Sequence, residues 1–244
     1  MKRVIIVQAR MTSTRLPGKI LMNVGGRSML SQQVRRLKHC LSADEIVIAT
    51  TTNHGDDPVV SLARAENVRW YRGSEEDVLG RYAGAAREAQ ADVILRVTSD
   101  CPLIDPAETD RVVNELTSHA SECDYASNVI HRTFPRGLDS EAFFDDVLER
   151  CDRLGTSASA REHVTHFILA ERRALFVLRS VSDGEDNSAL RWTVDTPEDL
   201  ALVRKLYEDL GIGDRLVPWR EVLTYVRKNH ELMKLNSQIV QKSP

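Results

Sequence analysis

The amino-acid sequence predicts a three-layer α/β fold around a mostly parallel sheet. Short apolar runs rich in β-branched residues alternate with longer amphipathic stretches along the chain. The runs lie at residues 4–7, 45–49, 68–71 and 93–97. Because they show no polar alternation, we expect them to be strands buried on both faces. The helical stretches between them favour parallel pairing through right-handed crossovers.

Helices are predicted between these strands from the spacing of apolar residues. Residues 28–41, 56–66 and 75–90 each place apolar side chains on one helical face. Later in the chain, Asp105 supplies an N-cap before a proline, and Glu108 is expected to complete a capping box. A further helix is therefore expected to begin after Asp105.

A similar start signal occurs near the C-terminus. The run Thr196-Pro197-Glu198-Asp199 predicts a helix that ends near Gly211. A last helix is predicted over residues 219–228. The polar tail beyond Asn236 is expected to lie on the periphery or to fray.

Residues from about 128 to 185 break the strand–helix alternation. A polar, proline-bearing stretch is followed by predicted helices over 144–153 and 160–171 and by a strand over 175–180. No linker separates this segment from its surroundings. Residues 1–244 are therefore expected to form a single domain that carries an insertion or edge feature here.

The composition is that of an ordinary soluble protein. The 244 residues carry 33 basic and 36 acidic side chains, a formal net charge of −3. This balance does not suit a dedicated nucleic-acid binder, and 42% hydrophobic residues exclude a disordered chain. The four cysteines lie far apart, which favours reduced thiols over disulfides or zinc. No signal-peptide core or membrane span is evident, so we expect a cytoplasmic protein with no nucleic-acid or membrane partner.

The first chemical signal is a basic loop directly after the first predicted strand. It contains Arg10, Arg15 and Lys19, together with Ser13 and a Pro-Gly turn. Ligands of open α/β sheets bind at the carboxyl ends of the strands, so this loop is expected over the binding crevice. Arginine forks and a lysine point charge suit a polyphosphate. The loop lacks the residue order of a P-loop, and a solvated basic turn is the alternative interpretation.

Two aspartates supply a candidate magnesium site. Asp100 follows the fourth predicted strand, and Asp195 precedes a predicted helix start. Mg²⁺ takes one or two carboxylates together with phosphate oxygens and water, which fits a triphosphate on the basic loop. The alternatives are that Asp100 caps its turn and that Asp195 belongs to a helix N-terminus.

These segments together resemble a known family. The motifs are QARMTSTRLPGK at 8–19, TSDCPLID at 98–105 and RWTVDTPEDL at 191–200. They are similar to the cytidylyltransferases that activate acidic sugars, the 3-deoxy-manno-octulosonate and acylneuraminate cytidylyltransferase superfamily. Three further motifs resemble the branch named after spore-coat polysaccharide biosynthesis: GSEEDVLGRY at 73–82, SNVIHRTFPRGLD at 127–139 and REHVT at 161–165. The resemblance covers about residues 2–209.

The resemblance implies a Rossmann-like nucleotidyltransferase sheet and assigns roles to individual residues. The implied catalytic set is Arg10, Arg15, Lys19, Asp100 and Asp195, with the two aspartates as Mg²⁺ ligands. Nucleotide binding is implied for Ala9, Arg10, Ser13, Arg15, Lys19, Ser74, Asp77, Arg81 and Thr98. The chain departs from octulosonate-activating members, which carry a glutamine–glycine pair where it has Thr98-Ser99.

The implied reaction transfers CMP from CTP to an acidic sugar or a related polyhydroxy acid and releases pyrophosphate, for surface polysaccharide or glycan synthesis. Acceptor binding is expected from Arg132, Arg136, Glu162 and His163, with His131, Arg161 and Arg191 as further candidates. Arginine forks match carboxylates, and Glu162 with His163 would orient the acceptor. The alternative interpretations are surface or helix-end charges for the cations and a structural histidine at position 163. The resemblance also implies a homodimer built through residues 128–185. The identity of the acid and the choice of CTP over other triphosphates stay open.

Three alternative functions remain. A nucleotide-sugar-dependent glycosyltransferase would share the sheet and a metal-binding aspartate, but it normally carries an Asp-x-Asp pair, and residues 99–102 contain one acid. A sugar-phosphate nucleotidyltransferase usually has a glycine-rich first loop. A non-catalytic nucleotide-binding module needs the same cations, so only an assay distinguishes it.

Overall fold

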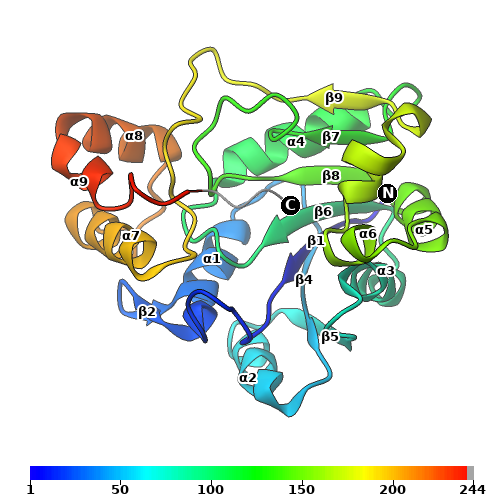
Figure 1. Ribbon diagram of the computed structural model, residues 1–244, viewed down its shortest axis with the longest axis horizontal. Coiled ribbons are helices and arrows are strands. Elements are labelled where there is room, and N and C mark those ends of the chain that lie inside the picture. The colour runs from blue at the N-terminus through cyan, green and yellow to red at the C-terminus, as the bar shows by residue number, and fades with distance from the viewer. Residues whose placement is uncertain (241–244) are drawn as a thin grey trace.

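The computed structural model describes residues 1–240 and contains a seven-stranded sheet with helices on both faces (Figure 1). The strands are β1 (Arg3–Gln8), β4 (Glu45–Thr51), β5 (Arg69–Gly73), β6 (Val93–Thr98), β7 (Tyr125–Ser127), β8 (Glu141–Phe144) and β9 (Leu178–Ser180). Their order is β5-β4-β1-β6-β8-β7-β9. The first four predicted strands are confirmed, and they form the parallel part of the sheet. A two-stranded hairpin, β2 (Asn23–Val24) with β3 (Arg27–Ser28), lies outside the sheet.

The mixed edge of the sheet is formed by the segment that breaks the sequence rhythm. β8 runs antiparallel to both β6 and β7, whereas β9 pairs parallel with β7 at the outer edge. The predicted strand over 175–180 therefore exists as the shorter β9. β8 and β9 of this segment extend the edge of the main sheet together with β7, which lies just before residue 128. The sequence pattern predicts only the strand over 175–180, so β7 and β8 are additions to the prediction.

Two groups of helices cover the two faces of the sheet. One face carries α1 (Met29–Leu37), α2 (Asp57–Ala65), α4 (Pro106–Ser118), α7 (Pro197–Leu210) and α8 (Trp219–Lys228). The other carries α3 (Val78–Ala89), α5 (Asp145–Leu154) and α6 (Ala158–Glu162), which group on the right in Figure 1. Successive β1 residues alternate between the two cores: Ile5 and Val7 face the first group, and Val4 and Ile6 the second. A short helix, α9 (His230–Lys234), follows α8.

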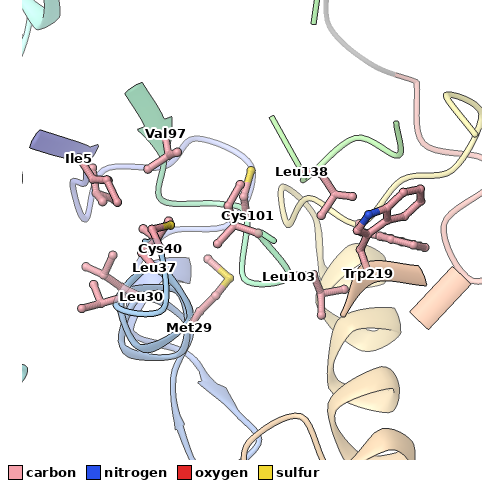
Figure 2. Packing of buried hydrophobic residues seen from close by; sticks show 14 of the residues in the cluster. Ile5, Met29, Leu30, Leu37, Cys40, Val97, Cys101, Leu103, Leu138 and Trp219 are labelled. Carbon is pink, nitrogen blue, oxygen red and sulfur yellow. The ribbon is translucent and has the colours of Figure 1, made fainter. Parts of the chain in front are cut away.

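The larger core extends from the sheet to the turn after β6. Figure 2 shows Ile5 and Val97 of the sheet close to α1, and Cys101 packed between this group and Leu138. Beyond them, Leu103 lies near Trp219 at the start of α8. Buried apolar side chains therefore pack against the turn that carries Asp100.

Three local predictions are wrong. The helix predicted over 160–171 breaks after Glu162, because Val164 has φ = 39° and a separate π-type turn spans Phe167–Glu171. Apolar spacing fits one continuous helix there, so periodicity alone does not reveal the break. The predicted helix over 28–41 ends at Leu37.

The third wrong prediction is the capping box at Glu108. Asp105 does cap α4 by accepting from two backbone N–H groups. Glu108 instead accepts a hydrogen bond from the indole of Trp219 at 2.9 Å. This contact with a distant residue replaces the local capping hydrogen bond. The capping box between Thr196 and Asp199 is confirmed.

All four cysteines are buried thiols without a disulfide partner, as expected. Among residues 1–240, no helix is long and apolar enough to cross a bilayer.

One glycine holds the 128–139 loop against the segment that carries Asp195. Gly137 has φ = +107°, and a Cβ there would lie 2.6 Å from the Thr193 backbone nitrogen. We expect Gly137→Ala to lower the free energy of unfolding by about 2–4 kcal/mol, from backbone strain and overpacking. Urea unfolding measures this. Gly184→Ala is the matched control, because a Cβ at Gly184 meets nothing within 4 Å; equal losses in both variants would contradict the account.

Candidate active site

The basic loop after β1 is folded into a compact turn over the carboxyl ends of the strands. Ala9 donates its backbone N–H to Ala49 of β4 at 3.1 Å, and Met11 donates to the buried carboxylate of Asp56 at 2.7 Å. Gly18, with φ = +69°, closes the loop by donating to the Met11 carbonyl at 3.0 Å. This left-handed residue immediately precedes Lys19, so the turn directs the chain and its lysine back toward the sheet.

Lys19 is the centre of the site. Its ammonium lies 2.8 Å from Asp195 Oδ1 and 3.5 Å from Asp100 Oδ2, and it donates to the Val194 carbonyl at 2.7 Å. Burial alone would lower the pKa of Lys19, but the two carboxylates outweigh it, so the pKa lies above its ordinary value. The lysine therefore stays charged at neutral pH.

Asp195 is held by three cations. Its Oδ2 lies 2.9 Å from Arg15 and 2.7 Å from Arg191, while Oδ1 faces Lys19. Burial would raise the pKa of Asp195, but Lys19, Arg191 and Arg15 together hold it below its ordinary value. The carboxylate is therefore ionised throughout the neutral range.

Asp100 is fixed by its own turn and by the segment before Asp195. Its Oδ1 accepts from the Thr98 hydroxyl at 2.6 Å. Its backbone carbonyl accepts from the N–H of Val194 at 2.8 Å and from the Thr193 hydroxyl at 3.1 Å. The two predicted metal ligands, which are far apart in the sequence, thus belong to one hydrogen-bonded unit.

These segments enclose a cavity of about 390 Å³ above the ends of β1 and β6. Its position matches the rule that ligands bind where the strand order reverses, since the chain proceeds from β1 to β4 on one side and returns to β6 on the other. The sequence-predicted residues that line it are Ala9, Arg10, Ser13, Arg15, Lys19, Arg81, Thr98, Asp100, Glu162, His163 and Asp195. Residues that the sequence analysis did not single out complete the lining: Gln8, Thr12, Thr14, Ile20, Val78 and Ser99.

Two of the residues implied for the nucleotide lie outside this lining. Ser74 is exposed, and its carbonyl accepts from the guanidinium of Arg81. Asp77 caps α3 by accepting from the Gly80 N–H at 2.8 Å and pairs with Arg161 at 2.7 Å. The structure therefore gives both residues supporting contacts: Ser74 fixes Arg81, and Asp77 joins α3 to α6.

The arginines expected to bind the acceptor are also placed differently. Arg132 forms a two-pronged ion pair with Asp139, at 2.6 and 2.7 Å, outside the cavity lining. Arg136 lies beside the site, since its backbone forms a bridge with Arg191. Arg191 itself is buried and pairs with Asp195 and Asp199, so the structure uses it to hold a carboxylate of the protein.

Sequence reasoning missed two acidic residues that organise the cations. Glu75 lies 3.6 Å from Arg10 and accepts from the Thr12 hydroxyl, which ties the basic loop to the segment after β5. Asp199 has a side chain that is 0% exposed and pairs with Arg191 at 2.9 Å. In the sequence, Asp199 belongs to a pattern that indicates only a helix start. Nothing in the local pattern of either residue names its distant partner.

The carboxylates of the cavity form a small donor set for a divalent cation. Among residues 1–240, no group of three or more His, Cys, Asp or Glu side chains is arranged to hold an ion. Asp100 and Asp195 nevertheless converge on one cation, the ammonium of Lys19. Two carboxylates beside a triphosphate site are a donor set that fits Mg²⁺, which keeps water and phosphate oxygens as its other ligands.

Because the pKa of Asp195 is depressed, we expect this carboxylate to make the free energy of unfolding of the metal-free protein depend on pH under acidic conditions. A carboxylate whose folded pKa is lowered stabilises the fold above its unfolded value, about 4, and loses this effect as pH falls through the folded pKa. The difference in unfolding free energy between wild type and Asp195→Asn should therefore be large at pH 7 and shrink below about pH 4. Urea unfolding in EDTA across this range measures it. A difference that stays constant with pH would contradict the ion-pair assignment.

Comparison with known proteins agrees with this architecture. Residues 4–229 match the family model described as cytidylyltransferase. The chain is 32% identical to the spore coat polysaccharide biosynthesis protein SpsF of Bacillus subtilis, over 92% of this chain and 93% of that one. A 3-deoxy-manno-octulosonate cytidylyltransferase of Geobacter metallireducens is 33% identical over 50% of this chain and 47% of its own length. The solved structure of a cytidylyltransferase from Leptospira borgpetersenii superposes with a TM-score of 0.91 at 31% identity, covering 100% of both chains. The resemblance inferred from the motifs is confirmed, and the chain belongs to the cytidylyltransferase family.

Proposed function

We propose that this enzyme transfers CMP from CTP to an acidic sugar or a related polyhydroxy acid and releases pyrophosphate, as a step in surface polysaccharide or glycan synthesis. The family supports the cytidylyl transfer, and the similar proteins named for spore-coat polysaccharide and octulosonate activation support the substrate class. The observation that carries the proposal is the meeting of Arg15 and Lys19 with two distant carboxylates in one cavity at the strand ends.

The reaction is an in-line displacement at the α-phosphorus. The acceptor hydroxyl oxygen forms a bond to this phosphorus, the bond to the oxygen bridging the β-phosphorus breaks, and the hydroxyl proton passes to water. Such a reaction requires positioning and charge neutralisation more than a protein nucleophile. Arg10, Arg15 and Lys19 would bind the phosphates and offset the charge that develops on the leaving pyrophosphate.

We also propose that Mg²⁺ takes part, held by Asp100 and Asp195. Four cations and three carboxylates line the cavity, so the protein alone neutralises little of the charge of a triphosphate. The bound ion would supply further positive charge at the phosphates. Lys19 and Arg191 would orient the two carboxylates, because both contact Asp195 and Lys19 also contacts Asp100.

The acceptor end of the cavity is assigned to the C-terminal end of α6. Glu162 and His163 line the cavity there, although the sequence separates them widely from the basic loop. A carboxylate suits sugar hydroxyls as an acceptor of hydrogen bonds, and an imidazole suits an acidic group as a donor. Arg136 lies next to Arg191 and would reach a longer acceptor from outside the lining.

Pyrophosphate release tests the reaction directly. We expect release in the presence of Mg²⁺ with CTP and an acidic sugar, measured over four nucleoside triphosphates crossed with a panel of acidic sugars. Turnover only with a sugar 1-phosphate would replace this proposal with a sugar-phosphate nucleotidyltransferase. Tight CTP binding without release for any acceptor would indicate a nucleotide-binding module.

The metal assignment predicts the effect of removing one carboxylate. Asp100→Ala should lower kcat by about 10²–10³-fold, as for the loss of one preorganised charge-stabilising group. Steady-state kinetics with varied Mg²⁺ measure this. Asp186→Ala is the matched control, because Asp186 is an exposed loop residue outside the cavity. Near-parental turnover of Asp100→Ala would make the metal assignment wrong.

Two further features remain proposals. We propose a homodimer through residues 128–185, where Leu175 and Val177 are 53% and 54% exposed beside the edge strand β9. Light scattering on the purified protein tests it.

We also propose that the enzyme works in the cytoplasm, since its four unpaired thiols suit a reducing compartment.

A further inference from the structure

Asn236 lies close to the end of the described chain, yet its side chain is buried against Arg191 and Asp199, on either side of Asp195 in the sequence. It is 6% exposed, although the polar tail that begins directly after it is expected to lie on the periphery or to fray. Its Nδ2 donates to the backbone carbonyl of Arg191 and to Asp199 Oδ1, both at 2.9 Å. The tail therefore returns to the segment that carries Asp195.

Asp199 connects this asparagine to Asp195. One of its oxygens, Oδ2, accepts the backbone N–H of Asp195 at 2.9 Å and that of Thr196 at 3.1 Å. The other oxygen, Oδ1, accepts from Arg191 Nε at 2.9 Å as well as from Asn236. Asp199 thus fixes the backbone of Asp195 on one side and the guanidinium of Arg191 on the other.

Arg191 completes the connection. Its second terminal nitrogen donates to Asp195 Oδ2 at 2.7 Å and to Asp199 Oδ2 at 3.0 Å. A rotation of the Asp199 carboxylate would change both the backbone and the side-chain contacts of Asp195. Asn236 opposes this rotation, because its amide is held at once by the Asp199 carboxylate and by the Arg191 carbonyl.

The position requires a neutral donor. Both groups that face the Asn236 nitrogen are acceptors, so the amide can take only one orientation. An aspartate of nearly the same shape would place a second carboxylate against Asp199 and an unpaired oxygen against the Arg191 carbonyl. An aliphatic side chain of similar size would leave both acceptors without this partner.

We propose that Asn236 is a positioning residue for the cytidylyl transfer. It fixes the Asp199–Arg191 pair, and this pair sets the direction in which the Asp195 carboxylate meets the triphosphate. The proposal rests on the proposed function for the role of Asp195. Asn236 contacts Arg191 and Asp199, which hold Asp195, and it does not itself line the cavity.

The first test uses ligand-free protein and does not depend on activity. Backbone hydrogen exchange at Asp195 and Thr196 reports whether Asp199 still holds their N–H groups. We expect exchange at these two amides to be at least about tenfold faster in Asn236→Asp than in wild type. Exchange requires local opening that breaks their hydrogen bonds to Asp199, and the variant makes this opening more frequent. Gln238→Glu is the matched control: it makes the same amide-to-acid change two residues along, at an exposed position.

The second test separates positioning from general loss of structure. Among molecules shown to be folded by circular dichroism, Asn236→Asp should lower kcat about tenfold to hundredfold and change the KM for CTP by less than about threefold, as for residues that orient a metal ligand. The Kd of Mn²⁺ in the presence of CTP, measured by electron paramagnetic resonance, should rise by a similar factor to the loss in kcat. Asn236→Leu, which adds no charge, carries the same test if Asn236→Asp does not fold.

Exchange at Asp195 and Thr196 that is as slow in Asn236→Asp and Asn236→Leu as in wild type would overturn the proposal. Faster exchange with unchanged kcat and Mn²⁺ affinity would also overturn it, because the contact would then be structural only. If wild type turns over no CTP, the exchange result still decides whether Asn236 holds this segment, and the failure belongs to the proposed function.

Discussion

The structure depends on the pairing of Lys19 with Asp195. These side chains come from the first loop and from a segment 176 residues later, and both are 11% exposed. Removal of either would unbalance a cluster of poorly hydrated charges, which is more costly than the loss of a surface ion pair. Lys19 also contacts Asp100, and Asp195 also contacts Arg15. One ionic contact therefore joins the N-terminal loop, the turn after β6 and the segment before α7 into a single site.

This arrangement explains why the site is built from distant parts of the chain. The sheet brings the ends of β1 and β6 side by side, but the carboxylate of Asp195 comes from neither strand. It is delivered by a segment that crosses the Asp100 turn and is hydrogen-bonded to it by Val194. The loop around Gly137 packs against the backbone of Trp192 and Thr193 in the same segment. Stability and the proposed ligand binding thus share one set of contacts, so strain at Gly137 and loss of charge at Asp195 act on the same unit.

Much of this organisation could be predicted from the sequence, because it follows from local rules. Buried β-branched runs identify parallel strands, and the rule that ligands bind at the strand ends brings the 10–19 loop and Asp100 together. The rest depends on long-range partners that no local pattern names. Arg191 has the residue type of a substrate-binding arginine, but it forms ion pairs with Asp195 and Asp199. Glu108 does not form a capping box, because its side chain accepts a hydrogen bond from Trp219. Asn236 is a buried residue in an otherwise largely exposed stretch, and no local pattern distinguishes it from its neighbours.

We propose that the triphosphate and its divalent ion bind at the Lys19–Asp195–Asp100 cluster. The most direct measurement is the crystal structure of the protein with CTP and Mn²⁺, in which anomalous scattering locates the ion. The account predicts an anomalous peak coordinated by Asp100 and Asp195, with phosphate oxygens on Arg15 and Lys19. Ordered CTP in another cavity, or an ion coordinated by neither aspartate, would contradict it.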